Sequence, residues 1–322
     1  MSYKLKTFSE FSDELENLWS TFQNINENPF LNFIINKTWF NIFGGNIDLK
    51  IISAEKKFIA PMIIKDNIAY FCGGKDLFDY HDLIYGKNLE KQFIKLVLDE
   101  LLSIKGLKKI ELNSILEDSK LLKIITSLEN DYDIEYINED VCPMINLPES
   151  FEDYLSNLSK KNRHEIRRKM RKFENNLDFK VIESNKSNID LLIPEFFRLM
   201  KLNPEKKQFL NKKRIDFMSK IIKDSINRGY GFLNFIEIKN EMIASSFSFK
   251  TKEKLFVYNS GFNNNFSEYS VGLLNHVYNI KDKIQNFKVI DFLRGPEEYK
   301  YRIGCEDKNL LTINIKAFRS WE

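Results

Sequence analysis

The amino-acid sequence predicts an α/β protein in which the same order of strands and helices occurs twice. Three short β-type runs separated by tight polar turns lie within residues 49–72, and three more lie within residues 232–261. Each set is followed by an apolar pattern with the 3.6-residue spacing of a helix. With 322 residues, of which 43% are hydrophobic, the chain can form two domains with their own cores. We therefore expect an α/β (α+β) architecture with mixed central sheets flanked by helices, in domains of residues 1–148 and 149–322.

The elements of the first unit are predicted from its apolar runs and from the residues that interrupt them. The turns at 55–57 and 65–67 are short enough to connect hairpins, and Phe93, Val97 and Ile104 share one helix face. The expected elements are strands at 49–53, 58–64 and 68–72, a helix at 93–104, a strand at 109–112, a helix at 118–128, and strands at 132–137 and 143–147.

The second unit is predicted in the same way, after a helical linking region. Pro296 suits the first turn of a helix, where its missing N–H group is harmless. The linking region is expected to contain helices at 159–174, 188–202 and 211–228. The second unit is expected to contain strands at 232–238, 242–249 and 255–261, a helix at 271–284, a strand at 288–293, a short helix after Pro296, and a strand at 310–317.

Composition and charge exclude several classes of protein. The 49 basic and 46 acidic residues give a net charge of only +3, so any anion-binding surface must be local rather than a general nucleic-acid coat. Cys72, Cys142 and Cys305 are scattered, which argues against a disulfide framework or a zinc site, and we expect no metal. No apolar run approaches the roughly 18 residues of a membrane span, and no secretory signal is visible. These features predict a cytoplasmic protein without a transmembrane segment.

The segment 159–174 combines a helical pattern with strong positive charge. Lys160, Arg163, Arg167 and Arg171 follow i, i+3 and i+4 spacing, so one helix face carries a row of cations. Like charges at this spacing repel one another, which favours an anionic partner such as a nucleotide-sugar diphosphate, the tRNA backbone or a CoA phosphate. The alternative is a solvated face without a partner.

An apolar run that ends near residue 293 leads into a cluster of charged and phenolic side chains. Asp291 and Arg294 lie at its end, although charge is costly away from water unless it is paired. Glu298, Tyr299 and Lys300 follow a Gly-Pro turn. Such a cluster suits the mouth of a cleft in which acid, base and cation act together. The alternative is a strand that ends in a solvated turn.

Several short motifs occur in a fixed order along most of the chain. They are NPF at 28–30 with Trp39, DYHDL at 79–83, CP at 142–143, LSKKNR at 158–163, SGF at 260–262, YSVGLL at 269–274, and DFLRG at 291–295 with EYK at 298–300. Together with the repeated meander, helix, strand, helix and strand, they resemble the CelD/BcsL-type, FemAB-related acyltransferases of the GNAT superfamily. Val271 departs from that pattern, since the family commonly has proline there.

This resemblance implies tandem GNAT-like acyl-CoA N-acyltransferase domains, the first of them degenerate. The implied reaction transfers an acyl or aminoacyl group to an amine of a cell-envelope saccharide or peptide precursor that is carried on a nucleotide or lipid. Acyl-CoA, such as acetyl-CoA, is the implied donor. Aminoacyl-tRNA also stays open, because the glycine-rich pyrophosphate loop of simple GNAT acetylases is not well formed here. A non-catalytic GNAT-fold module that binds an envelope precursor or a protein partner is the alternative.

The donor site implied by the resemblance lies at the start of the helix at 271–284. In this fold two neighbouring strands separate and leave backbone amides and a helix N-terminus for the phosphates of the donor. The expected donor-binding residues are Tyr269, Ser270, Gly272 and Leu273, with Ser270 as N-cap and Gly272 allowing a close approach to the backbone.

The implied catalytic and acceptor residues come mostly from the second unit and from the seam between the two. Asp291 or Glu298 would take a proton from the acceptor amine. Lys300 would stabilise the oxyanion or the leaving group, with its pKa lowered by a neighbour such as Arg302. His276 has no partner that the sequence identifies and is expected to be structural. The expected acceptor-binding residues are Asp79, Tyr80, His81, Arg163, Arg167, Arg294 and Tyr299.

Overall fold

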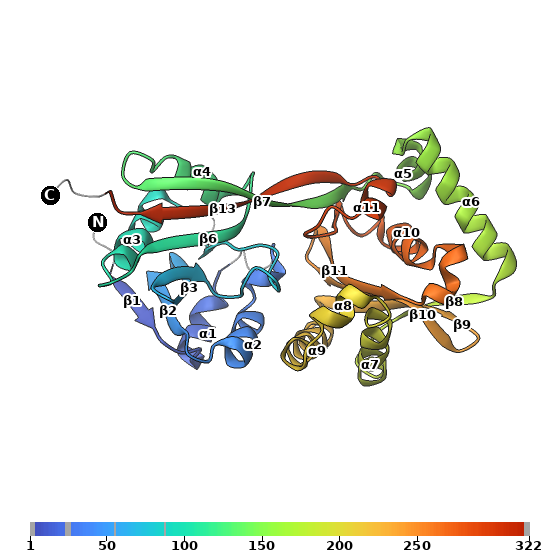
Figure 1. Ribbon diagram of the computed structural model, residues 1–322, viewed down its shortest axis with the longest axis horizontal. Helices are drawn as coiled ribbons and strands as arrows, with labels where there is room; N and C mark the ends of the chain where they lie inside the picture. Colours follow the sequence, from blue (N-terminus) through green and yellow to red (C-terminus); the bar gives the residue numbers. More distant parts are fainter. Residues whose placement is uncertain (1–3, 23–26, 55, 87, 319–322) are drawn as a thin grey trace. The chain divides into compact units, whose positions relative to one another are not determined.

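A computed structural model describes residues 4–22, 27–54, 56–86 and 88–318 (Figure 1). Contacts divide these residues into two compact units. Unit 1 contains the described residues up to Val141 and those from Lys308 onward, and unit 2 is Cys142–Asp307. This division differs from the predicted boundary after residue 148, because Leu310 in the last strand pairs with Leu116 of unit 1.

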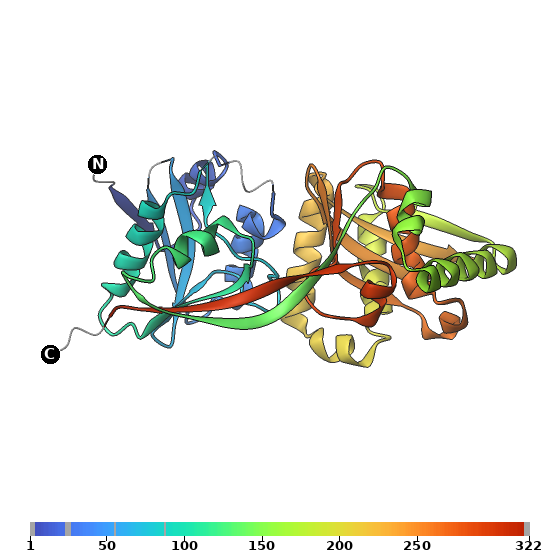
Figure 2. The same ribbon diagram turned by 90° about the horizontal axis from the view of Figure 1, so that it is seen from above.

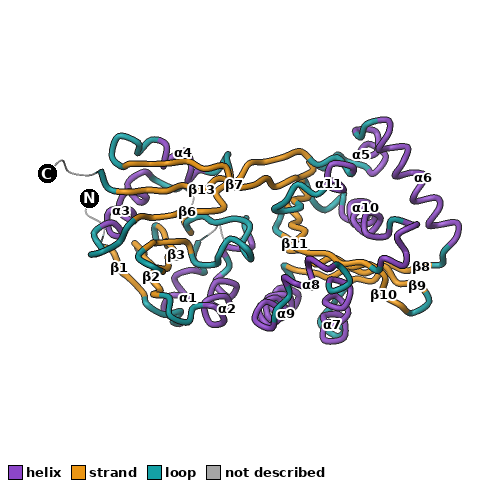
Figure 3. The backbone as a smooth tube through the Cα atoms, in the orientation of Figure 1, coloured by secondary structure: helices purple, strands orange, loops and turns teal. Residues whose placement is uncertain are grey.

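The sheet of unit 1 has the strand order β1-β2-β3-β4-β6-β13-β7, with β5 paired to β3, and β7 (Asp133–Asn146) continues into unit 2. Neighbours from β1 to β4 are antiparallel, whereas β4 and β6 are parallel because a crossover helix connects them. Its strands are β1 (Leu5–Phe8), β2 (Asp48–Ala54), β3 (Phe58–Lys65), β4 (Ile68–Phe71), β5 (Ile84–Tyr85), β6 (Lys109–Leu116) and most of β13 (Glu306–Lys316). Its helices are α1 (Asp13–Trp19), η2 (Pro29–Leu31), α2 (Phe33–Phe43), α3 (Lys91–Leu102) and α4 (Lys120–Thr126). Figure 3 shows these elements along the backbone trace.

The core of unit 1 forms where α3 and α4 pack against the sheet. Phe93, Val97 and Leu101 lie on one face of α3 and are buried against strand residues such as Ile110. Their 3.6-residue spacing places them on that face, which is why the helix was predictable.

The sheet of unit 2 has the strand order β7-β12-β11-β10-β9-β8. β8 to β11 are antiparallel, β11 and β12 are parallel, and β12 is antiparallel to β7. Its strands are the end of β7 (Asp133–Asn146), β8 (Phe179–Glu183), β9 (Gly231–Ile238), β10 (Glu241–Lys250), β11 (Lys254–Phe262) and β12 (Val289–Asp291). Its helices are α5 (Phe151–Asn157), α6 (Lys160–Asn176), α7 (Ile189–Met200), α8 (Pro204–Phe209), α9 (Lys212–Asn227), η3 (Asn264–Tyr269), α10 (Val271–Lys283) and α11 (Glu298–Arg302).

Helices cover both faces of the unit 2 sheet. Figure 1 shows α10 on one side of strands β9 to β11 and α7 and α9 on the other, in agreement with their contacts. On the α10 side, Leu274 and Val277 pack with Ile236 and Leu255 of the strands in one buried apolar cluster. The predicted mixed sheets flanked by helices are therefore confirmed.

Several elements differ from the prediction, and the following examples concern the chain between residues 132 and 317. The two short strands expected at 132–137 and 143–147 form the single 14-residue strand β7, which lies beside β13 (Figure 2). Pro296 precedes α11 rather than lying in its first turn, since Glu297 is the N-cap residue. The last strand begins at Glu306, four residues earlier than expected. Among the described helices, none is both long and apolar enough to cross a membrane.

Candidate functional site

The parallel strands β11 and β12 of unit 2 separate after three paired positions. The last pair is Phe256 with Asp291, where β12 ends, but β11 continues to Phe262. Beyond Phe256, the described pairing of β11 is with β10 alone. A bulge at Phe247/Ser248 in that pairing bends the ribbon at the same level, as bulges do. The edge of β11 between Val257 and Phe262 is thereby left for side chains or a ligand.

The chain turns sharply after β12, and the turn is held by its own polar groups. The Asp291 carboxylate accepts a hydrogen bond of 2.8 Å from the backbone N–H of Leu293. Leu293 has φ of +55° and Gly295 has φ of +107°, and a left-handed conformation at a leucine is costly. As a result, the carbonyl groups of Leu293, Arg294 and Gly295 all accept hydrogen bonds from the Lys300 ammonium, at 3.1, 3.0 and 2.9 Å.

Lys300 is a buried cation with a full set of acceptors. Its side chain is only 2% exposed, and its Nζ atom lies 2.9 Å from the Glu297 carboxylate as well as close to the three carbonyl oxygens. An ammonium group has three protons, so these acceptors satisfy it completely. Arg302, the expected neighbouring cation, is exposed and pairs with Glu298 at 2.7 Å. The geometry therefore gives Lys300 the task of holding the turn after β12.

Lys206 is a second cation near this turn, and sequence reasoning missed it. It lies on the short helix α8 and donates a hydrogen bond of 2.6 Å to the carbonyl oxygen of Ser260, on the separated part of β11. Burial lowers the pKa of Lys206 to about 8; Glu297 acts in the opposite direction, and Lys300 lowers it further. The one sequence signal was Asn203-Pro204, a pair that suits a helix start.

His276 of α10 packs against the helix that follows the turn. Its ring stacks on Tyr299, with centroids 5.1 Å apart, and meets Phe292 edge-on at 5.4 Å. Burial, Lys206 and Lys300 together lower the pKa of His276 to about 3, so the ring is neutral near pH 7. Within the described residues its buried Nδ1 atom has no hydrogen-bond partner. Burial raises the pKa of Tyr299, which keeps its hydroxyl protonated.

The loop before α10 contains the predicted donor-binding residues, together with cations from α6. Ser270 is the N-cap residue, but it has φ of +58° and its side chain does not cap the helix. Instead its hydroxyl accepts a hydrogen bond of 2.5 Å from Lys169. The Lys172 ammonium lies 4.7 Å from the centre of the Tyr269 ring and 3.1 Å from the Glu268 carboxylate.

Gly272 has a packing role that sequence reasoning did not anticipate. A Cβ atom at this position would lie 2.7 Å from the ring of Phe262, at the end of β11. The Phe262 side chain thus fills the space in which a side chain at position 272 would lie. Leu273 is partly buried against the apolar cluster of unit 2.

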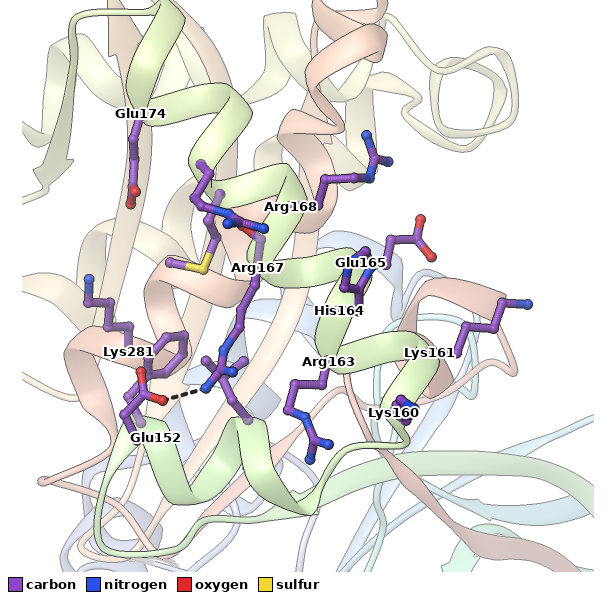
Figure 4. Close-up of a pocket in the computed structure, with 14 residues that line it drawn as sticks. Glu152, Lys160, Lys161, Arg163, His164, Glu165, Arg167, Arg168, Glu174 and Lys281 are labelled. Atoms are coloured by element: carbon purple, nitrogen blue, oxygen red, sulfur yellow. Dashed lines mark hydrogen bonds and ion pairs between the residues drawn. The ribbon is translucent and has the colours of Figure 1, made fainter.

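Arg163 and Arg167 line a surface groove of about 1390 Å³ between α5, α6 and the end of α10 (Figure 4). Both guanidinium groups already have partners in this unit. Arg163 donates to the carbonyl oxygen of Ser156 at 2.9 Å, and Arg167 pairs with Glu152 at 2.6 Å. A ligand phosphate would compete with these partners or join them.

The remaining expected acceptor residues belong to unit 1. His81 is buried between the rings of Phe71 and Phe78, and its Nδ1 atom lies 3.2 Å from the carbonyl oxygen of Asn113. Tyr80 is buried as well, and Asp79 is partly buried. The structure brings together, in unit 2, the side chains around the turn after β12, whereas these three residues belong to unit 1.

Comparisons with known proteins agree with the fold. Residues 160–301 match the sequence family described as "Acetyltransferase (GNAT) domain". No curated protein sequence matches the chain.

Three solved structures are similar over most of the chain. FemX is 10% identical with a TM-score of 0.63, covering 98% of this chain and 97% of its own. L-PGS from Bacillus licheniformis is 10% identical with a TM-score of 0.61, and the match covers 97% of this chain and 94% of the L-PGS chain. A tandem GNAT protein from the clavulanic acid biosynthesis pathway is 7% identical with a TM-score of 0.51, covering 97% and 98%. At such low identity the similarity establishes the fold alone.

Proposed function

Starting from the GNAT acetyltransferase domain that residues 160–301 match, we propose that this protein is an N-acyltransferase whose chemistry takes place beside the separated part of β11. The observation that carries this proposal is the early end of β12 at Asp291, while β11 continues to Phe262. The separation exposes a strand edge next to a half-buried lysine, Lys206, and the turn held by Lys300. A thioester laid along that edge would lie next to Lys206, whose ammonium group contacts the Ser260 carbonyl oxygen on the edge.

The donor is proposed to be an acyl-CoA, as GNAT domains use, with its phosphates at the loop before α10. Directly after Tyr269 and Ser270, the first turn of α10 offers backbone N–H groups and the positive end of a helix. Lys169 lies directly on the Ser270 hydroxyl, so a phosphate there would meet a cation without a large movement. Aminoacyl-tRNA remains the second donor to be tested.

Lys206 is proposed as the group that takes the proton from the acceptor amine. With a pKa of about 8, the Lys206 amine is neutral in part of the protein molecules near physiological pH. The neutral amine is the form that a general base requires. The amine nitrogen attacks the thioester carbonyl carbon, the new C–N bond forms, and the C–S bond breaks as the thiolate leaves. Asp291 and Glu298, the carboxylates expected in this role, are less suitable. Asp291 is buried with an oxygen committed to Leu293, and Glu298 is exposed and paired with Arg302.

Lys300 is proposed as a positioning residue. Its contacts fix the turn that contains Arg294, and Arg294 is the proposed forked contact for a phosphate or carboxylate of the acceptor. Tyr299, next to Lys300 and stacked on His276, is proposed to contact the acceptor as well.

The acceptor is proposed to be an amine of a cell-envelope saccharide or peptide precursor. FemX and L-PGS share the fold at 10% identity, which makes envelope substrates the first to test. Arg163, Arg167 and the unit 1 residues Asp79, Tyr80 and His81 stay proposals for acceptor binding.

The test is transfer of a labelled acyl group by the purified protein. Acetyl-CoA, a longer acyl-CoA and a charged tRNA are supplied separately, each with amino-sugar nucleotides or short precursor peptides. We expect transfer from an acyl-CoA that is lost in Lys206→Met and retained in Lys207→Met, an exposed neighbour on α8. Donor binding without transfer to any acceptor would instead identify a binding module.

A further inference from the structure

The net positive charge of this protein comes from one helix, α6. α6 carries eight basic and two acidic residues, whereas the whole chain has 49 basic and 46 acidic ones. The rest of the chain therefore has a small acidic excess. α6 has 17 residues and is about 25 Å long, so its charge density is high along a straight element.

Part of this charge has no counter-ion in the part of the chain that the structure describes. Lys160, Lys161 and Arg168 are exposed, and the described residues include no carboxylate paired with them. In Figure 4 the side chains of Lys161 and Arg168 extend away from the helix. Repulsion between such neighbours is unfavourable unless an external anion offsets it.

The acidic residues along the groove beside α6 are already engaged. Glu152 pairs with Arg167, Glu165 lies 3.3 Å from Lys169, and Glu174 accepts from the Tyr278 hydroxyl. They therefore do little to neutralise the unpaired cations.

The lining of the groove is apolar as well as basic. Phe151 contributes partly exposed apolar surface among the cations, above the buried side chains of Leu155 and Met170 that also line the groove. A nucleic acid would use exposed aromatic faces for base stacking, but Phe151 stacks on Tyr154 at 5.6 Å and has the Lys281 ammonium 5.8 Å from its ring centre. Apolar side chains among cations suit a surface in which phosphates lie above hydrocarbon.

We infer that α6 and its groove form a docking surface for an anionic phospholipid bilayer. Lys160, Lys161 and Arg168 would contact lipid phosphates, and Phe151 would meet the hydrocarbon just below the headgroups. Clusters of four to eight basic residues on a helix bind anionic lipid by this attraction. The inference does not rest on the proposed acyl transfer, because bilayer binding is measured without donor or acceptor.

The test is sedimentation of the full-length protein with vesicles of phosphatidylcholine alone or mixed with phosphatidylserine. We expect binding only to the vesicles that contain phosphatidylserine, and we expect added salt to weaken it. Changing Lys160, Lys161 and Arg168 together to Gln should lower the partition coefficient about a hundredfold. The matched control changes Lys186, Lys212 and Lys213 to Gln, which removes the same charge from other exposed positions and should keep most of the binding.

A second variant separates lipid from a general polyanion. Phe151→Ala leaves the charge unchanged, so it should weaken vesicle binding severalfold without changing affinity for a single-stranded RNA oligonucleotide. Thermal unfolding establishes that this variant is folded. Equal losses in the triple variant and its control would overturn the docking surface. The protein could instead bind RNA tightly, with vesicle binding that Phe151→Ala does not affect. That result would identify a nucleic acid, not a bilayer, as the partner of α6.

Discussion

The ammonium group of Lys206 lies 2.6 Å from the carbonyl oxygen of Ser260, at a level where β11 has already separated from β12. A side chain from a six-residue helix thus reaches the strand edge that a parallel neighbour would otherwise cover. Because Lys300 is close enough to lower the pKa of Lys206, the two cations are coupled electrostatically. A change that removes the charge of Lys300 therefore alters the protonation of Lys206.

Lys206→Met is expected to lower kcat/KM by about a hundredfold or more, since general-base catalysis contributes at least this much. In the unchanged protein the neutral amine is the active form, so kcat/KM should rise with pH and level off above about pH 8. The variant should lose this rise. If kcat/KM of the variant rises with pH as in the unchanged protein, a group other than Lys206 causes the rise.

The same pKa predicts how stability depends on pH. The Lys206 pKa falls from 10.5 in the unfolded chain to about 8 in the folded protein, so between these values the unfolded chain binds more protons. Stability should therefore increase as pH rises from about 8 to 10.5. Urea unfolding over this pH range measures the effect. The free energy of unfolding should increase less in Lys206→Met than in the Lys207→Met control.

Lys300→Met is expected to destabilise the protein by about 3 kcal/mol, because three carbonyl groups of the turn lose their donor and each unsatisfied acceptor costs about 1 kcal/mol or more. This outcome differs from the role that the resemblance implies for Lys300, which is to stabilise the oxyanion or the leaving group. Chemical denaturation measures it, with exposed Lys308→Met as the control. A variant with unchanged stability and at least tenfold lower turnover would restore the oxyanion role.

Lys169→Gln is expected to raise the Kd of the acyl donor about tenfold, which corresponds to roughly 1.4 kcal/mol. The side chain is mostly buried and lies on the Ser270 hydroxyl, where it would contact a donor phosphate. Calorimetric titration of CoA measures the effect, and Lys160→Gln on the same helix is the control. Equal affinities of the two variants would remove Lys169 from the donor site.

Gly272→Ala should destabilise the protein by forcing the Phe262 ring away, since the added Cβ atom would lie 2.7 Å from that ring. Combining it with Phe262→Ala should recover part of the loss, because the two positions are in contact. A double-mutant cycle of unfolding free energies checks this coupling. Additive effects would mean that Phe262 moves aside without cost.

The two meanders and the long amphipathic helices could be predicted because their patterns are local. β3 and β10 consist of apolar runs bounded by short turns, and α3 has its apolar residues at helical spacing. The strand β7 was divided in two because polar residues and Pro143 interrupt its apolar pattern. Its length depends on pairing with β12 and β13, which no window of the sequence contains.

The candidate site could be predicted only in part, for a similar reason. Asp291, Arg294 and Lys300 were singled out because charged residues follow an apolar run. Their partners could not be predicted: the three protons of Lys300 are satisfied by backbone groups whose convergence depends on positive φ at Leu293. Lys206 resembled any other surface lysine until α8 placed it against β11.

The return of the chain to unit 1 at Lys308 affects how the protein is made on the ribosome. Unit 2 is one continuous stretch, so every residue it needs is available once position 307 has left the exit tunnel. The sheet of unit 1 is completed later, because β13, which pairs with β6, follows all of unit 2 in the sequence. Until then the edge of β6 presents unpaired backbone groups, which favour association with other strands. The N-terminal unit is thus the later of the two to be completed, and nascent chains are most prone to aggregate before β13 emerges.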